Sequence, residues 1–338
     1  MGDTCNFDCV YCDRDFIKHK IGSQNLLRRD TDEIVSFMEV AFENAKDLRA
    51  ISFHGGEPFL YIKRIDEYMD KLYPLLEKYG IEVYITTNGS HIVENEWFFE
   101  KWKGIIHITL SYDFNYQEVN REYVDLKALS EVIYKHNCYL MFQFVVPTDG
   151  FNEETIANVI SSSKLARCNT INVIPLRHHR GKDKFKVFVD DMNHKWYRVN
   201  LMRFIQTLYV HGMVVNIDGN YGKIDKHYLD NHGKIIISPD GYLYPEFDWL
   251  EYKNKNFRVG KWKDGIELYR KSSEEEFLLD KCKTCPMRSS CGLKYIYYDF
   301  GGTPQDHGCV EFYKTINLMV AHLHKLKEKP TLMHWIGI

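Results

Sequence analysis

The sequence lacks the features that mark membrane-spanning and exported proteins. It has no apolar run long enough to cross a bilayer, and residues 1–12 hold acids and cysteines where a signal peptide needs an apolar stretch. It also lacks an excess of charge of either sign, because the net charge of its 338 residues is −3. No overall basic field therefore points to nucleic acid as a partner. We expect a cytoplasmic protein without membrane association.

Cysteine, by contrast, is plentiful. The chain has nine cysteines, and because cytosolic thiols are kept reduced, they favour metal ligation over disulfides. Seven of them fall in two clusters. The other two, Cys138 and Cys168, stand beside apolar strand-like runs, and we expect both to be buried structural thiols. With 44% hydrophobic residues, the chain can bury one large domain or one plus a smaller module.

The first cluster places Cys5, Cys9 and Cys12 at C-x₃-C-x₂-C spacing. Three thiolates on one short loop hold three corners of a cubane iron–sulfur cluster, whereas an electron-transfer cluster is closed by four. One iron is then left open for a small molecule, as in catalytic metal sites. A zinc knuckle or a disulfide framework would also use three close thiols, and both remain alternatives at this point.

From residue 30 onward the pattern alternates between helix and strand. Asp30 and Glu33 form a capping box ahead of apolar residues at helical spacing. The elements expected from such periodicity are helices at 31–47, 62–79, 94–103, 122–136, 152–165 and 192–211, and strands at 50–53, 81–87, 105–111, 138–146 and 169–175. With a first strand overlapping the residues before Cys5, the strands number six. Strands separated by helices predict a parallel α/β sheet that curls into a partial (β/α)₆ TIM barrel, with functional residues at the carboxyl ends of its strands.

Polar motifs follow three of these strands. The glycines of residues 55–58 let a ligand approach the backbone, and Glu57 or nearby carbonyls can accept hydrogen bonds from an ammonium group. Residues 86–89 follow the next strand, and residues 111–113 end the one after it. Arg121 comes ten residues after Ser111 and offers the fork that suits a carboxylate. Each motif has a plain alternative as a turn or a solvated charge.

Together these motifs resemble the radical S-adenosylmethionine (SAM) superfamily, from the N-terminus to about residue 320. The resemblance implies that SAM chelates the open iron of a [4Fe-4S] cluster and that one electron cleaves it reductively to a 5′-deoxyadenosyl radical. That radical abstracts a hydrogen atom from the substrate. The resemblance also assigns the SAM amine to the Gly-Gly-Glu motif, the SAM carboxylate to Ser111 and Arg121, and the adenine to apolar contacts. The SAM-binding residues implied are Tyr11, Gly55, Gly56, Glu57, Thr87, Asn88, Ser111, Asp113, Arg121 and Ile174.

One position departs from the family pattern. The family usually has glycine after the aspartate matched by Asp113, and this chain has Phe114. The path of the loop after Asp113 is therefore an open question for the structure.

The second cluster follows a predicted hairpin. Residues 235–245 predict a strand, a tight Pro-Asp-Gly turn and a returning strand. Beyond it come Cys282, Cys285 and Cys291 at C-x₂-C-x₅-C spacing, and then Cys309. Four thiols at such spacing favour a metal centre, either zinc or an iron–sulfur cluster.

The hairpin and these cysteines resemble the SPASM extension of radical SAM enzymes. Three cysteines of that pattern are absent here: Glu246 and Tyr295 stand at two positions, and residues 226–231 contain none. All three belong to the same auxiliary cluster, so the resemblance implies one auxiliary [4Fe-4S] cluster, held by the remaining four thiols. The expected domains are the radical SAM barrel at 1–212, the SPASM-like module at 213–325 and a tail at 326–338.

Acidic residues near the emptied cluster position are candidates for a catalytic base. Asp218 follows a short strand, and Glu246 and Asp248 follow the hairpin. In related enzymes an acid in this region can act as a base toward the substrate radical, which requires hydrogen-bond reach. Solvated surface is the plain alternative for all three.

The resemblance leaves the substrate open. Relatives with this extension mostly modify peptides or proteins, so a peptide or protein side chain is expected, with flavodoxin or ferredoxin as reductant. A small molecule, a nucleotide or a nucleic acid is an alternative, because residues 177–182 form a basic loop and the chain has 23 Tyr and 20 Phe that can stack on bases. A non-catalytic zinc-stapled binding protein is the alternative of another class.

Overall fold

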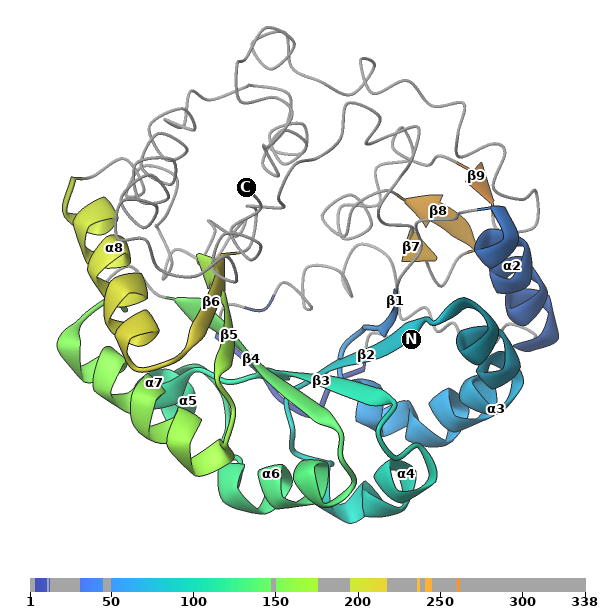
Figure 1. Cartoon of the computed structure of the whole chain (residues 1–338), viewed down its shortest axis with the longest axis horizontal. Coiled ribbons are helices and arrows are strands. Elements are labelled where there is room, and N and C mark those ends of the chain that lie inside the picture. The colour runs from blue at the N-terminus through green and yellow to red at the C-terminus, as the bar shows by residue number, and fades with distance from the viewer. Residues whose placement is uncertain are drawn as a thin grey trace, which may run out of the picture.

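The computed structural model describes residues 4–10, 12, 31–44, 50–146, 150–175, 195–217, 236–237, 241–244 and 260–261. Within this part of the chain, six strands form one curved sheet whose convex side is covered by helices (Figure 1). Three short strands form a second, separate sheet. None of the helices in these ranges has both the length and the apolarity that crossing a bilayer requires.

The large sheet is parallel throughout, and its strands follow chain order. Its strands are β1 (Ala50–Phe53), β2 (Glu82–Thr87), β3 (Ile106–Ser111), β4 (Tyr139–Val146), β5 (Thr170–Pro175) and β6 (Val214–Ile217). Each strand is joined to the next by helical crossovers, as parallel neighbours require. This confirms the predicted α/β class and the partial-barrel arrangement.

The sixth strand differs from the prediction. Thr4 and Cys5 are not in a strand, and residues 1–3 lie outside the described residues. The sixth strand of the sheet is instead β6, which pairs with β5. The sheet therefore extends to Ile217, past the expected domain boundary at residue 212. The division of the rest of the chain into domains stays a prediction.

The helices lie close to their predicted positions. They are α2 (Thr31–Asn44), α3 (Ile62–Tyr79), α4 (Glu96–Lys101), α5 (Gln117–Asn120), α6 (Leu126–Lys135), α7 (Glu153–Ala166) and α8 (Lys195–Val210). Short 3₁₀ turns precede three of them, at Pro58–Tyr61, Val93–Asn95 and Phe114–Tyr116. The helix predicted at 122–136 begins only at Leu126, because the Asp125 side chain caps it by accepting from the Ala128 N–H.

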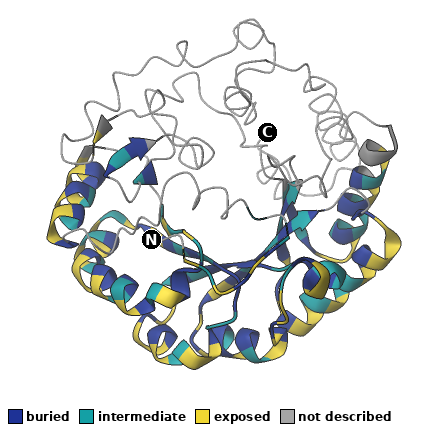
Figure 2. Ribbon diagram, turned by 180° about the vertical axis from the view of Figure 1, so that it is seen from behind, coloured by how far each residue is buried: buried dark blue, intermediate teal, exposed yellow. Residues whose placement is uncertain are grey.

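The two faces of the sheet differ in character. Successive side chains of a strand point to opposite faces. One face is apolar and fully buried against the helices, with Ile85, Ile108 and Phe142 each at 0% exposure (Figure 2). The other lines the concave side and carries mostly polar residues. Burial of the first face holds the fold together, and the second face carries the polar groups that a ligand site needs.

The small sheet confirms the predicted hairpin. Strands β7 (Ile236–Ile237) and β8 (Tyr242–Tyr244) pair antiparallel, and β9 (Gly260–Lys261) adds to β8. Leu243 of β8 is fully buried in a small cluster with Phe37 and Ala41 of α2. The hairpin is thereby packed against a barrel helix.

Cys138 and Cys168 are buried, as predicted, at 4% and 2% exposure. The Cys168 thiol donates to the Leu140 carbonyl oxygen at 3.2 Å, and burial raises its pKa to about 11. Both are structural thiols of the sheet and its helices.

Candidate functional site

The cysteine loop is tied to the carboxyl-end side of the sheet at both of its ends. The Thr4 carbonyl accepts from the Glu57 N–H at 2.9 Å, which joins the start of the loop to the turn after β1. The Val10 N–H donates to the Asn120 carbonyl at 3.0 Å, which joins its other end to α5. The Cys12 N–H donates to the Cys9 carbonyl at 3.0 Å and closes a tight turn. Three cysteines thus lie on a loop held by elements that follow β1 and β3.

The three thiols of this loop stand within eight consecutive residues. Burial raises the pKa of Cys9 to about 11; the nearby Arg121 cation opposes that rise, and the thiols of Cys12 and Cys5 add to it. Cys5, Cys9 and Cys12 are not in disulfides. No three Cys, His, Asp or Glu side chains of the described residues converge as a metal site. The donor set itself, three reduced thiols on one anchored loop, fits a cluster held by three thiolates.

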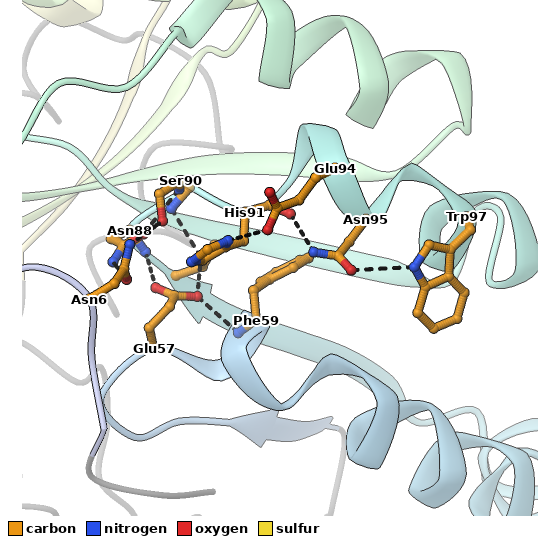
Figure 3. Close-up of polar contacts among 11 residues, drawn as sticks. Asn6, Glu57, Phe59, Asn88, Ser90, His91, Glu94, Asn95 and Trp97 are labelled. Carbon is orange, nitrogen blue, oxygen red and sulfur yellow. Dashed lines mark hydrogen bonds and ion pairs between the residues drawn. The ribbon is translucent and has the colours of Figure 1, made fainter.

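Glu57 is buried, and its hydrogen bonds join the turn after β1 to the end of β2. Its carboxylate, 1% exposed, accepts from the Phe59 N–H at 2.9 Å and the Thr87 hydroxyl at 2.7 Å on one oxygen (Figure 3). Its other oxygen accepts from the Asn88 N–H at 2.7 Å. Burial raises the pKa of Glu57, and these hydrogen bonds oppose the rise. Since internal donors occupy the carboxylate, backbone carbonyls of the glycine turn are the better acceptors for an ammonium group.

The turn after β2 reaches the cysteine loop. The Asn88 side chain is 5% exposed and bonds to Asn6 and Ser90, and its amide nitrogen lies 3.8 Å from the Cys5 sulfur. Gly89 follows at φ +84°, and a Cβ there would come within 2.6 Å of the Leu110 side chain. Glycine is therefore required for this turn to pack on the sheet.

Arg121 and Asp113 form a buried ion pair at the end of β3. The Arg121 Nε lies 3.0 Å from the Asp113 Oδ2, and their side chains are 8% and 0% exposed. Ser111 is the last residue of β3, two residues before Asp113. Its side chain is buried at 8% exposure, and its hydroxyl accepts a long hydrogen bond from the Gln143 amide at 3.5 Å. Arg121 directly follows Asn120, whose carbonyl accepts from the Val10 N–H, so the ion pair lies beside the cysteine loop. The structure thus gathers the predicted residues of β1, β2 and β3 around that loop.

Phe114, which stands where the family usually has glycine, adopts a backbone conformation typical of glycine. Its φ is +54°, the left-handed conformation that glycine adopts most easily. Its ring is 5% exposed and packs edge-on against Phe142 and Phe144, at centroid distances of 5.2 and 5.0 Å. The loop therefore keeps a glycine-like path, and aromatic packing stabilises it.

Polar side chains continue across the concave face from Ser111. Gln143, Asn172 and Asn216 are in register with Ser111 on the next three strands, and they define the carboxamide row. The Asn172 Oδ1 is buried and has no hydrogen-bond partner among the described residues. Ile174, predicted at the adenine, is half-buried two residues further along the same face. Sequence reasoning missed this row, because its members come together only through the register of neighbouring strands.

Several predicted site residues lie outside the described residues. These are Tyr11, the acids Asp218, Glu246 and Asp248, the basic loop 177–182, and the second cysteine cluster Cys282, Cys285, Cys291 and Cys309. Their assignments stay predictions.

The comparison with protein families bears directly on the loop and its surroundings. Residues 1–135 match the family model of the Radical SAM superfamily. The chain carries a radical SAM domain. The matched residues include the three cysteines, the glycine turn, and the Asp113 and Arg121 pair. A search of curated proteins found no match.

Solved structures share the fold of this chain over most of its length. The anSMEcpe structure with bound AdoMet and the Kp18Cys peptide is 18% identical with a TM-score of 0.68, covering 96% of each chain. Streptococcus suis SuiB bound to S-adenosylmethionine is 16% identical with a TM-score of 0.62, covering 86% of this chain and 70% of that one. SuiB bound to its precursor peptide SuiA is 17% identical with a TM-score of 0.58, covering 89% and 69%. At these identities the likeness concerns the fold.

Proposed function

We propose that the protein is a radical SAM enzyme that modifies a peptide or protein side chain in the cytoplasm. The observation that carries the proposal is the anchoring of the cysteine loop to the ends of β1 and β2 and to α5. A bound [4Fe-4S] cluster would supply the electron that cleaves SAM to the 5′-deoxyadenosyl radical. The protein's own residues bind and orient SAM and shield the radical.

We assign the SAM contacts to the residues around the loop. The backbone carbonyls of Gly55 and Gly56 are assigned to accept hydrogen bonds from the SAM amine, because the Glu57 carboxylate already accepts three hydrogen bonds within the protein. Ser111 and Arg121 are assigned to the carboxylate, with Asp113 holding the guanidinium in place. Ile174 and Tyr11 are assigned to the adenine. Fixing the ion pair before SAM arrives lowers the ordering cost of binding.

A peptide substrate is supported by the carboxamide row. Carboxamides both donate and accept hydrogen bonds, and so they complement the N–H and C=O groups of a peptide backbone. The row continues from Ser111 across the concave face, next to the proposed SAM site. The fold neighbours anSMEcpe and SuiB have structures with a peptide bound, which agrees with this choice.

We further propose one auxiliary [4Fe-4S] cluster on Cys282, Cys285, Cys291 and Cys309. A fully ligated cluster has no open iron, so it would relay electrons or stabilise the module. Asp218, Glu246 and Asp248 are proposed as candidates for the base. The base should be the one whose amide variant still forms 5′-deoxyadenosine but no product.

The test is anaerobic purification followed by iron, sulfide and zinc analysis and an assay for 5′-deoxyadenosine. With dithionite and SAM, the wild type should form 5′-deoxyadenosine, and Cys9→Ala should form none. The matched control is Cys138→Ala, which removes a buried structural thiol and should retain the activity. Zinc without iron, together with no 5′-deoxyadenosine, would refute the proposal and favour the zinc-stapled alternative.

The number of clusters is tested separately. Cys291→Ala should lose about half of the iron of the wild type, because one of two four-iron clusters loses a ligand. Unchanged iron content would refute the auxiliary cluster while leaving the SAM site intact.

A further inference from the structure

The orientation of the Asn88 carboxamide is fixed by its neighbours. Its oxygen accepts from the Ser90 backbone N–H at 3.0 Å and from the Ser90 hydroxyl at 2.7 Å. A backbone N–H can only donate, so the end of the amide that faces Ser90 must be the oxygen. The NH₂ group of Asn88 is thereby directed to the opposite side, toward the cysteine loop.

Asn6 closes a ring of hydrogen bonds around this amide (Figure 3). The Asn88 Nδ2 donates to the Asn6 Oδ1 at 3.0 Å, and the Asn6 Nδ2 donates to the Ser90 hydroxyl at 2.9 Å. The Ser90 hydroxyl in turn donates to the Asn88 oxygen. Each of the three side chains both donates and accepts, so rotating any one of them breaks two bonds. The ring connects the turn after β2 directly to the residue that follows Cys5.

One N–H of Asn88 remains for the Cys5 sulfur. One proton of its NH₂ group is used by Asn6, and the nitrogen lies 3.8 Å from the Cys5 Sγ. Asn88 is 5% exposed, so water competes little for this contact. An N–H that faces a thiolate stabilises negative charge on the sulfur.

We propose that Asn88 is a positioning residue that raises the reduction potential of the cluster held by Cys5, Cys9 and Cys12. Reduction by one electron from an external donor adds negative charge to the cluster and its sulfurs, and a hydrogen bond to sulfur stabilises that charge. The Asn88 carboxamide thus acts on the cluster through Cys5, in place of the direct SAM contact that the sequence predicts. The inference rests on the proposed function, since it requires a cluster on these three cysteines.

The test is a redox titration of the full-length reconstituted protein, with dithionite as reductant. The reduced cluster is followed by electron paramagnetic resonance on the signal that changes when SAM is added. Asn88→Ala should lower the midpoint potential by an amount that corresponds to about tenfold in the reduction equilibrium, or ~59 mV for one electron. Asn88→Asp keeps the acceptor for Ser90 and loses the donor, so it should lower the potential at least as far.

Two further variants separate tuning from folding. Ser90→Ala leaves Asn88 in place but removes the hydroxyl that orients it, and should give a smaller fall in the same direction. Asn95→Ala is the matched control, because Asn95 donates to the His91 carbonyl in the same segment without contacting the cysteine loop. It should keep the wild-type potential.

The outcomes distinguish this inference from the proposed function. Wild-type potentials in Asn88→Ala, Asn88→Asp and Ser90→Ala, at equal iron content, would overturn the inference and leave the function standing. Loss of the cluster in Asn88→Ala with an unchanged potential in Ser90→Ala would also overturn it, since the role would then be structural. Absence of any cluster in the wild type would instead refute the function itself.

Discussion

The carboxylate of Glu57 accepts a hydrogen bond from the backbone N–H of Asn88 at 2.7 Å, so the turn after β1 is tied to the end of β2. The Thr87 hydroxyl and the Phe59 N–H complete its shell of donors. A buried acceptor with three donors stabilises a fold mainly through what its removal would leave unsatisfied. Glu57 therefore belongs to the architecture of the site as much as to ligand binding.

Replacing Glu57 should destabilise the protein before it affects chemistry. Glu57→Ala leaves three buried donors without acceptors, and each costs about 1–3 kcal/mol, so we expect a loss of roughly 3 kcal/mol or more in unfolding free energy. Urea unfolding followed by circular dichroism measures it. Glu82→Ala, at an exposed strand position, is the control and should change stability by less than about 0.5 kcal/mol. A Glu57→Ala variant as stable as this control would contradict the stabilising role of the Glu57 hydrogen bonds.

Phe114 offers a test of backbone strain against packing. Phe114→Ala removes a buried ring and should cost about 3–4 kcal/mol. Phe114→Gly loses the same ring but relieves the left-handed strain at φ +54°, so it should be about 1 kcal/mol more stable than the alanine variant. Urea unfolding of both variants, with the exposed Val119→Ala as control, measures the difference. A glycine variant less stable than the alanine variant would show that the conformation carries no strain.

Stability should fall in alkaline solution partly because of Cys168. Its pKa rises from 9.0 to about 11 on folding, so its contribution is complete below pH 9 and is lost as the pH rises toward 11. A shift of two pKa units corresponds to about 3 kcal/mol. Unfolding free energies at pH 8, 9 and 10 should decline less steeply in Cys168→Ala than in the wild type. Ser161→Ala, an exposed hydroxyl on α7, should decline as the wild type does; parallel curves for all three proteins would exclude the effect.

Asn172 should show a conflict between stability and function. Its Oδ1 is buried and lacks a partner among the described residues, so the apolar Asn172→Leu should unfold at an equal or higher temperature. If the row binds the substrate, the variant should still form 5′-deoxyadenosine in its absence, because SAM cleavage does not use Asn172. Thermal unfolding and the dithionite assay measure both properties. A melting temperature clearly below that of the wild type would contradict the assignment of Asn172 as an unsatisfied group.

Periodicity predicted most of the barrel because each strand and helix buries one regular face. Helix α3 matches its predicted bounds of 62–79, and Gly80 ends it in the left-handed conformation at φ +63°. The prediction was wrong where the local signal was weak: the sixth strand is Val214–Ile217, and a capping aspartate delays α6 to Leu126. A short strand before Asp218 was expected but not counted in the sheet, because its pairing with β5 is set by the fold and not by a local pattern.

The motifs located the site, but their internal bonding was not predictable. Spacing pointed to Glu57 and Asn88 as ligand contacts, whereas the structure occupies both side chains with protein partners. Such bonds join residues about 30 to 80 positions apart, and only the fold brings them together. The carboxamide row was missed for the same reason, because its members share a register across strands and no proximity in sequence.

The anchors of the cysteine loop also set an order of assembly. Residues 4–10 bond to partners at Glu57, Asn88 and Asn120, which lie up to 110 positions downstream. Closing such long chain loops costs entropy that local structure does not repay, so these contacts form late in folding. During synthesis, the thiols emerge before residue 120, so the scaffold that anchors their loop does not yet exist. In the proposed function, iron and sulfide are therefore delivered to the loop after the first half of the barrel has formed.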